Sequence, residues 1–176
     1  KGLRITLEDK RAGQEKKDSF CYEGGIRSFV EDLNASREQL LFPQPLYFEE
    51  ADGDTMCEVA IQYNESYNEV IYSYANNVNT IDGGTHVEGL RLALTKVIND
   101  YGKKAGLMKE SDKLSGEDVR EGITAVVSVK LVNAQFESQT KDKLNNSFIR
   151  SFVSQCVTEH LSAFMEENPS AAKELV

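Results

Sequence analysis

Two adjacent glycines, Gly83 and Gly84, precede a segment with helical apolar spacing, in the stretch NTIDGGTHVEGL. Glycine-rich loops that lead into helices often bind phosphate through their backbone N–H groups. A P-loop, however, requires the sequence GxxxxGK[ST], because its lysine reaches the phosphates and its hydroxyl binds magnesium. Here Gly84 is followed by Thr85 and His86, and the GxGxxG spacing of a dinucleotide site is also missing. The glycine pair therefore does not predict a phosphate site.

Thr85 and Glu88 give the glycine pair a structural explanation. A threonine followed three residues later by a glutamate is the pattern of a capping box. In that arrangement the Thr85 hydroxyl accepts a hydrogen bond from the N–H of Glu88, and the Glu88 carboxylate accepts one from the N–H of Thr85. We predict this cap, with the two glycines turning the chain from a strand into a helix.

The other residues suited to metal chemistry favour structural roles. Asp52 and Asp54 flank Gly53, but the spacing of a calcium-binding loop is missing, so we predict a hairpin turn. His86 has no second histidine at the spacing of a metal site. His160 falls on the apolar stripe of a predicted helix, and we expect a hydrogen-bonded core histidine there.

Composition limits the kinds of partner. The 29 acidic residues outnumber the 20 basic ones, for a net charge of −9, so any DNA contact requires a local basic patch. The basic pairs at 10–11 and 16–17 indicate only a solvated loop. Three widely spaced cysteines without a CxxC motif argue against a zinc site or a disulfide framework and favour a cytoplasmic location. The apolar run ITAVVSVKLV is interrupted by Ser128 and Lys130, so no membrane span is predicted.

The periodicity of apolar residues predicts the elements that position these side chains. Strands are predicted at 3–9 and 19–23, then an antiparallel meander at 46–50, 57–63 and 69–75, and a further strand at 122–131. Helices are predicted at 24–34, from Thr85 to about 104, and from 148 until Pro169 ends the pattern. The order indicates a single α+β domain over residues 1–176, an α/β sandwich with helices on one face of a mixed sheet. The chain opens without Met inside a strand-like pattern, so we expect a piece of a longer protein.

Three motifs occur in a characteristic order: DGGTHVEGLRLALTKVIN at 82–99, EDVREGITAVVSVKL at 117–131 and FESQTKDKL at 136–144. Together with YEGGIRSFVEDLN at 22–34, they resemble the B-subunit family of bacterial DNA gyrase, with its topoisomerase IV counterpart as the close sibling. The resemblance covers essentially the whole chain. The matching region is the transducer, the second domain of the ATPase half of these proteins.

The resemblance implies a ribosomal-protein-like fold with a left-handed βαβ crossover, although right-handed crossovers are the strong general rule. It also implies that the nucleotide pocket, the magnesium-binding asparagine and the general-base glutamate belong to a preceding domain. The cofactors implied for the full-length protein are ATP and Mg²⁺. The implied partners are the upstream ATP-binding domain, a gyrase A-type subunit and double-stranded DNA. We expect the isolated fragment to be monomeric and inactive.

The family's nucleotide-sensing loop matches QTKDK at 139–143. By resemblance, Lys141 contacts the γ-phosphate of ATP in the neighbouring domain, and Gln139 adds a hydrogen bond. A lysine is a compact cation that suits a terminal phosphate. Composition alone would indicate only an exposed polar loop before a helix. Arg91, which flanks the apolar stripe of its helix, is implied to face DNA, whereas the plain alternative is an arginine whose stem covers the core edge.

Three functional hypotheses follow. The first is the transducer of an ATP-dependent type II topoisomerase, which couples ATP hydrolysis to clamp movement and strand passage. The second is a stand-alone interaction module of the same fold without a nucleotide role. The third is membership of the mismatch-repair ATPases or the ninety-kilodalton heat-shock chaperones, which place a comparable basic residue on the phosphate. The combination of QTKDK with DGGTH favours the topoisomerase.

Overall fold

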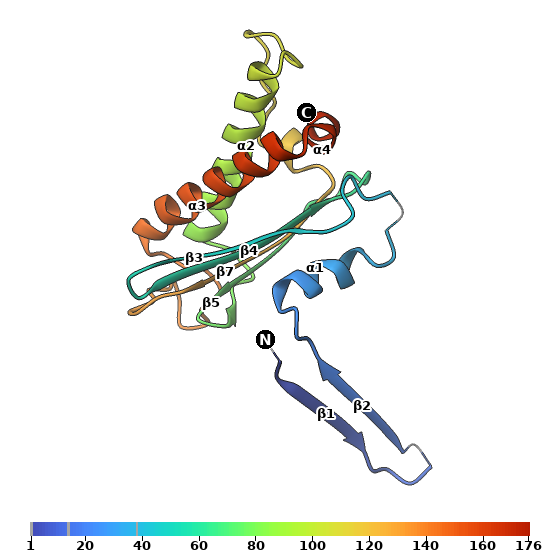
Figure 1. The fold of residues 1–176 in the computed structure, drawn as a ribbon. Helices are drawn as coiled ribbons and strands as arrows, with labels where there is room; N and C mark the ends of the chain where they lie inside the picture. The colour runs from blue at the N-terminus through green and yellow to red at the C-terminus, as the bar shows by residue number, and fades with distance from the viewer. Residues whose placement is uncertain (1, 14, 38) are drawn as a thin grey trace.

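The N-terminal strands form a hairpin that extends away from the rest of the molecule (Figure 1). The computed structural model describes residues 2–13, 15–37 and 39–176. Strand β1 (Arg4–Asp9) pairs antiparallel with β2 (Lys16–Cys21), so a strand is found at each of the two predicted N-terminal positions. Leu3, Ile5 and Leu7 are 74%, 53% and 63% exposed, so this hairpin leaves its apolar side chains in solvent.

The main sheet has five strands in the order β3-β4-β7-β5-β6. β3 (Leu46–Asp52) and β4 (Thr55–Tyr63) form an antiparallel hairpin. Gly53 lies at its turn with a φ of 57°, a left-handed conformation that glycine adopts at little cost. The predicted turn between Asp52 and Asp54 is therefore confirmed.

The predicted meander is wrong in one respect, because β5 (Val70–Ala75) does not pair with β4. The strand β7 (Ile123–Lys130) lies between them, antiparallel to β4 and parallel to β5. β7 is buried along nearly its whole length, so it takes the central position. Apolar alternation within a strand reports which face is covered but not which strand lies beside it. The short β6 (Val78–Asn79) completes the edge.

Two long helices, α2 (Thr85–Lys104) and α3 (Ser147–Glu167), pack together over one face of the sheet (Figure 1). Both confirm predicted helices. The short helix α4 (Pro169–Leu175) begins at the proline that was predicted to end α3. Within the described residues, no helix combines the length and apolar character required to span a membrane.

The opposite face of the sheet carries α1 (Ile26–Asn34), so the prediction of helices on one face only is wrong (Figure 1). Val30 of α1 packs on Ala60 and Val126, which are fully buried. Their small apolar side chains leave room for a helix on the face that was predicted to carry none. The face also contains a buried polar group, in which Asn34 donates to Gln62 at 2.8 Å. This arrangement satisfies amide groups that would otherwise be costly to bury.

His160 is half-buried rather than a core residue. Its Nε2 atom lies 2.7 Å from a carboxylate oxygen of Glu50, and its ring stacks on Phe48 with a centroid distance of 4.3 Å. The predicted hydrogen-bonded state is therefore found, but at the edge of the core.

Candidate functional site

The loop that contains the QTKDK sequence is closed at its base by main-chain hydrogen bonds. Phe136 and Leu144 form an antiparallel bridge, and the N–H of Glu137 donates to the carbonyl of Lys143 at 3.0 Å. At the tip the N–H of Lys141 donates to the carbonyl of Ser138 at 3.1 Å, and Lys141 has a φ of 61°. The tip is thus a tight turn on a closed base.

Lys141 and Gln139 are both exposed at this tip. Neither side chain makes a hydrogen bond or ion pair with any described residue. By contrast, Lys143 at the base pairs with Glu137 at 2.9 Å. The cation and the amide at the tip are thus open to solvent, whereas the cation at the base is neutralised by Glu137.

The base of the loop is also bound to the glycine pair in front of α2. The N–H of Asp82 donates to the carbonyl of Asp142 at 2.9 Å, and the N–H of Leu144 donates to the carbonyl of Gly83 at 3.1 Å. A Cβ atom on Gly84 would lie 2.2 Å from the carbonyl oxygen of Leu144. Only a glycine therefore allows the two backbones to approach this closely.

The predicted capping box is absent. Gly84 is the N-cap residue and Thr85 is already helical, with a buried hydroxyl that has no partner among the described residues. The N–H of Thr85 donates instead to the carbonyl of Leu144 at 3.1 Å, and Glu88 pairs with Arg150 at 2.8 Å. A tertiary contact thus supplies the acceptor that the local motif was expected to provide.

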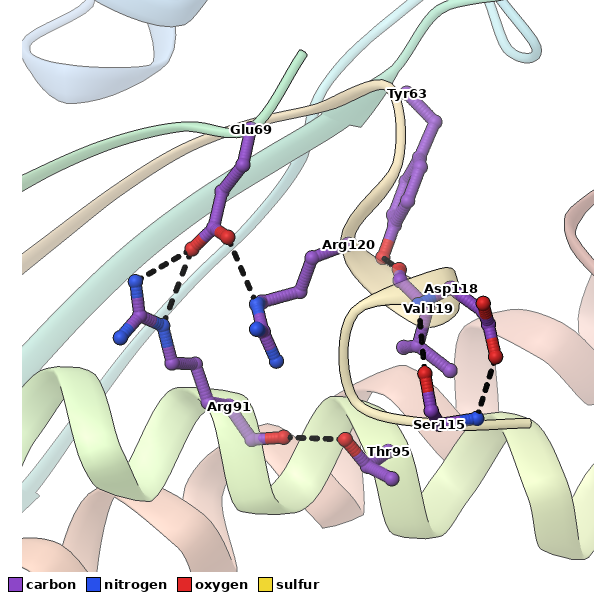
Figure 2. A network of polar contacts seen from close by, with 8 residues as sticks. All are labelled: Tyr63, Glu69, Arg91, Thr95, Ser115, Asp118, Val119 and Arg120. Carbon is purple, nitrogen blue, oxygen red and sulfur yellow. Dashed lines mark hydrogen bonds and ion pairs between the residues drawn. The ribbon is translucent and has the colours of Figure 1, made fainter. Parts of the chain in front are cut away.

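Arg91 on α2 is held by a glutamate that sequence reasoning missed (Figure 2). Its Nε and Nη2 atoms donate to one carboxylate oxygen of Glu69 at 3.1 and 2.6 Å. The Nε atom of Arg120 donates to the other oxygen at 2.9 Å. The Arg91 side chain is 46% exposed and the Arg120 side chain 16%, so Arg91 forms the outer part of the cluster. The arginine is neither free nor simply laid over the core edge.

The two arginines also set the protonation of Glu69. Burial raises the pKa of this carboxyl group, but the hydrogen bonds from Arg120 and Arg91 outweigh that effect and hold the pKa below its ordinary value. Glu69 is therefore a stable anion at neutral pH. No periodic signal identifies it, because its partners lie 22 and 51 positions away in the chain.

The segment before β7 positions Arg120 (Figure 2). A short 3₁₀ helix, η1 (Asp118–Arg120), is closed by a hydrogen bond of 2.7 Å from the N–H of Ser115 to Asp118. The buried hydroxyl of Tyr63 donates to the carbonyl of Val119 at 2.8 Å. The backbone beside Arg120 is thus anchored to β4 through Tyr63, and this anchor holds the Arg120 side chain in place for its hydrogen bond to Glu69.

A cavity of about 260 Å³ brings some of the candidate residues together. Its lining includes Gly83, Gly84, Arg91 and Lys143. Lys141 and Gln139 are not part of that lining, so the two basic residues singled out from the sequence occupy different places. No three histidine, cysteine or acidic side chains in the described part of the chain are positioned to bind a metal ion. These residues do not fit a magnesium site, and we assign them no metal-dependent step.

The family model for DNA gyrase B matches residues 25–176. The chain belongs to the DNA gyrase B family. The match to the family model begins just before α1, so the β1–β2 hairpin lies outside the matched region.

Relatives within the gyrase B family are similar along the full chain. The DNA gyrase B protein of Clostridium acetobutylicum is 53% identical over 98% of the chain, and that of Enterococcus faecalis is 50% identical over all of it. In both cases the chain spans only 27% of the relative.

Solved structures agree with this assignment. The 43K ATPase domain of Thermus thermophilus gyrase B, determined with an aminocoumarin, has a TM-score of 0.83 and 39% identity. The match covers 98% of this chain and 46% of that one. The topoisomerase IV ATP-binding domain of Francisella tularensis has a TM-score of 0.78 and 26% identity. The mixed five-stranded α+β fold is therefore shared with ATPase-region structures of gyrase B.

Proposed function

We propose that residues 1–176 form the transducer domain of a bacterial ATP-dependent type II DNA topoisomerase. In this role the chain senses ATP bound to a preceding domain and couples hydrolysis to clamp movement and strand passage. The proposal includes a left-handed βαβ crossover, formed by β5, α2 and β7. The observation that carries it is Lys141, which is exposed and has no ion-pair partner among the described residues, at the tip of a loop whose base is hydrogen-bonded to the start of α2.

Lys141 is suited to report the state of a terminal phosphate. Its ammonium group donates hydrogen bonds to phosphate oxygens and stabilises the negative charge that is spread over a transferring phosphoryl group. Gln139, two residues earlier on the same exposed turn, supplies an amide N–H to the same group. When the terminal phosphate leaves, both contacts are lost and the loop is released. Release of the loop then allows the two domains to move relative to one another.

The exposed hairpin supports an interface with the preceding domain. Ile5 and Leu7 lie on one side of β1, the exposed Leu3 directly precedes the strand, and Phe20 on β2 is paired with Ile5. An apolar surface of this kind is unusual on an isolated domain. We propose that the upstream ATP-binding domain covers it.

Arg91 is proposed to face double-stranded DNA. Arginine binds phosphate oxygens without reading base sequence, as passage of an arbitrary duplex requires. Glu69 and Arg120 leave the cluster with one net positive charge on a chain that is acidic overall. This is the kind of local basic group that an acidic protein needs for a DNA contact.

The test is Lys141→Ala in the full-length protein, assembled with its gyrase A-type partner. We expect ATP turnover to fall on the order of 100-fold, because a positioned charge on the transferring group is lost. Lys113→Ala is the matched control, since Lys113 is also exposed and makes no ion pair among the described residues. Wild-type turnover in Lys141→Ala would reject the proposed role.

A further inference from the structure

Glu69 lies at the centre of the cluster in Figure 2, between an inner and an outer arginine. Arg120 donates to one carboxylate oxygen at 2.9 Å and is largely buried. Arg91 donates twice to the other oxygen, at 3.1 and 2.6 Å, and is nearly half exposed. The carboxylate is therefore fixed from the protein side by Arg120 and fixes Arg91 on the solvent side.

Arg91 keeps binding capacity while Glu69 holds it. A guanidinium group has five N–H donors, of which Glu69 takes one on Nε and one on Nη2. No described residue accepts the remaining three. One carboxylate between two arginines leaves a net charge of about +1, so an anion is attracted without displacement of the glutamate.

We infer that Glu69 is a positioning residue, which holds the Arg91 guanidinium in the orientation that receives a phosphate of the DNA duplex. The inference rests on the DNA-facing role proposed for Arg91. An arginine held by two hydrogen bonds loses less conformational freedom on binding than a free one does. Glu69 thus lowers the entropic cost of the contact and contributes no contact to DNA itself.

The opposite reading makes Glu69 a competitor that masks Arg91. The two readings predict effects of opposite sign. Removal of a carboxylate makes the surface more positive, and general electrostatics then predicts tighter DNA binding. A positioning role predicts weaker binding despite the added positive charge.

The experiment measures the DNA concentration that half-maximally stimulates ATP turnover by the complete enzyme, at several salt concentrations. We expect Glu69→Ala to raise this concentration about fivefold, the cost of ordering one free arginine side chain on binding. Glu69→Gln should show a smaller rise, because its amide oxygen still accepts from Arg91. Glu65→Ala, at an exposed glutamate in the preceding loop, removes the same charge without a contact to Arg91, and it should leave the value unchanged or lower it.

A double-mutant cycle identifies the route of the effect. Glu69→Ala should cause no further weakening in an Arg91→Gln background, because the glutamate acts only through that arginine. If Arg91→Gln weakens stimulation while Glu69→Ala and Glu69→Gln leave it unchanged or stronger, the positioning role is wrong and the DNA role of Arg91 stands. If Arg91→Gln has no effect, both proposals fall.

Folding is monitored by circular dichroism and by ATP turnover without DNA. If Glu69→Ala does not fold, the result for Glu69→Gln decides whether Glu69 positions Arg91. That variant must then weaken stimulation measurably, and unchanged or stronger stimulation overturns the inference.

Discussion

The carbonyl oxygen of Leu144 lies so close to Gly84 that a Cβ atom at position 84 would be 2.2 Å away. This contact joins the end of the QTKDK loop to the first turn of α2. It is reinforced by the hydrogen bonds from the N–H of Thr85 to Leu144 and from the N–H of Leu144 to Gly83. The loop with Lys141 and the helix with Arg91 are therefore connected through main-chain groups.

Gly84→Ala should destabilise the chain by about 2 kcal/mol or more, because the new Cβ atom would push the main chain of Leu144 away from that of residue 84. Gly106→Ala is the matched control. Gly84 has a φ of 128° and Gly106 a φ of 69°, but a Cβ atom at Gly106 meets nothing within 4 Å. We expect that control to cost about 1 kcal/mol, the strain of the left-handed conformation alone. Urea unfolding of both variants measures the difference, and equal losses would show that the Leu144 contact is unimportant.

The isolated chain should not bind ATP measurably. A single lysine about 4 Å from a phosphate charge gains roughly 4 kcal/mol at an effective dielectric constant near 20, before desolvation and entropy costs. Even that full amount corresponds to about millimolar affinity. Isothermal titration with a non-hydrolysable ATP analogue should show only the heat of dilution. A micromolar dissociation constant would mean that the chain holds much more of the nucleotide site than Lys141 and Gln139.

Protonation of His86 should make the fold sensitive to acid. The ring is fully buried at the start of α2, and its Nε2 atom lies 3.0 Å from the hydroxyl of Thr80. Burial lowers the pKa of His86 to about 4. The unfolded chain therefore binds a proton near the ordinary pKa of 6.5, whereas the folded chain does not until about pH 4. The neutral ring contributes its full stabilisation above pH 6.5, the pKa of the unfolded chain. This stabilisation is lost as the pH falls from 6.5 to about 4.

The expected loss is on the order of 3 kcal/mol between about pH 7 and pH 4. Urea unfolding at both pH values measures it. His86→Gln should show a smaller dependence on pH in that range, because glutamine does not titrate. If the wild type and His86→Gln lose the same stability, other groups are responsible for the acid sensitivity.

Local patterns predicted the elements well. The apolar stripe from Val87 to Tyr101 predicted α2, and the Asp-Gly step at 52–53 predicted the β3–β4 turn. They predicted the helix α1 but not its place on the second face of the sheet, and they did not predict the cap of α2. The capping-box motif is present in the sequence. In the structure, however, the N–H of Thr85 donates to the carbonyl of Leu144, and the carboxylate of Glu88 pairs with Arg150.

The sequence by itself determined the type of nearly every element, the family through three motifs in order, and the candidate residues Gln139, Lys141 and Arg91. Each of these depends on neighbours within a few positions or on the identity of a short segment. Only the tertiary structure decided that β7 lies between β4 and β5, that Glu69 holds Arg91, and that Leu144 meets Gly84. These contacts join residues distant in the chain, and periodicity along one segment reports a buried face without naming the segment that covers it.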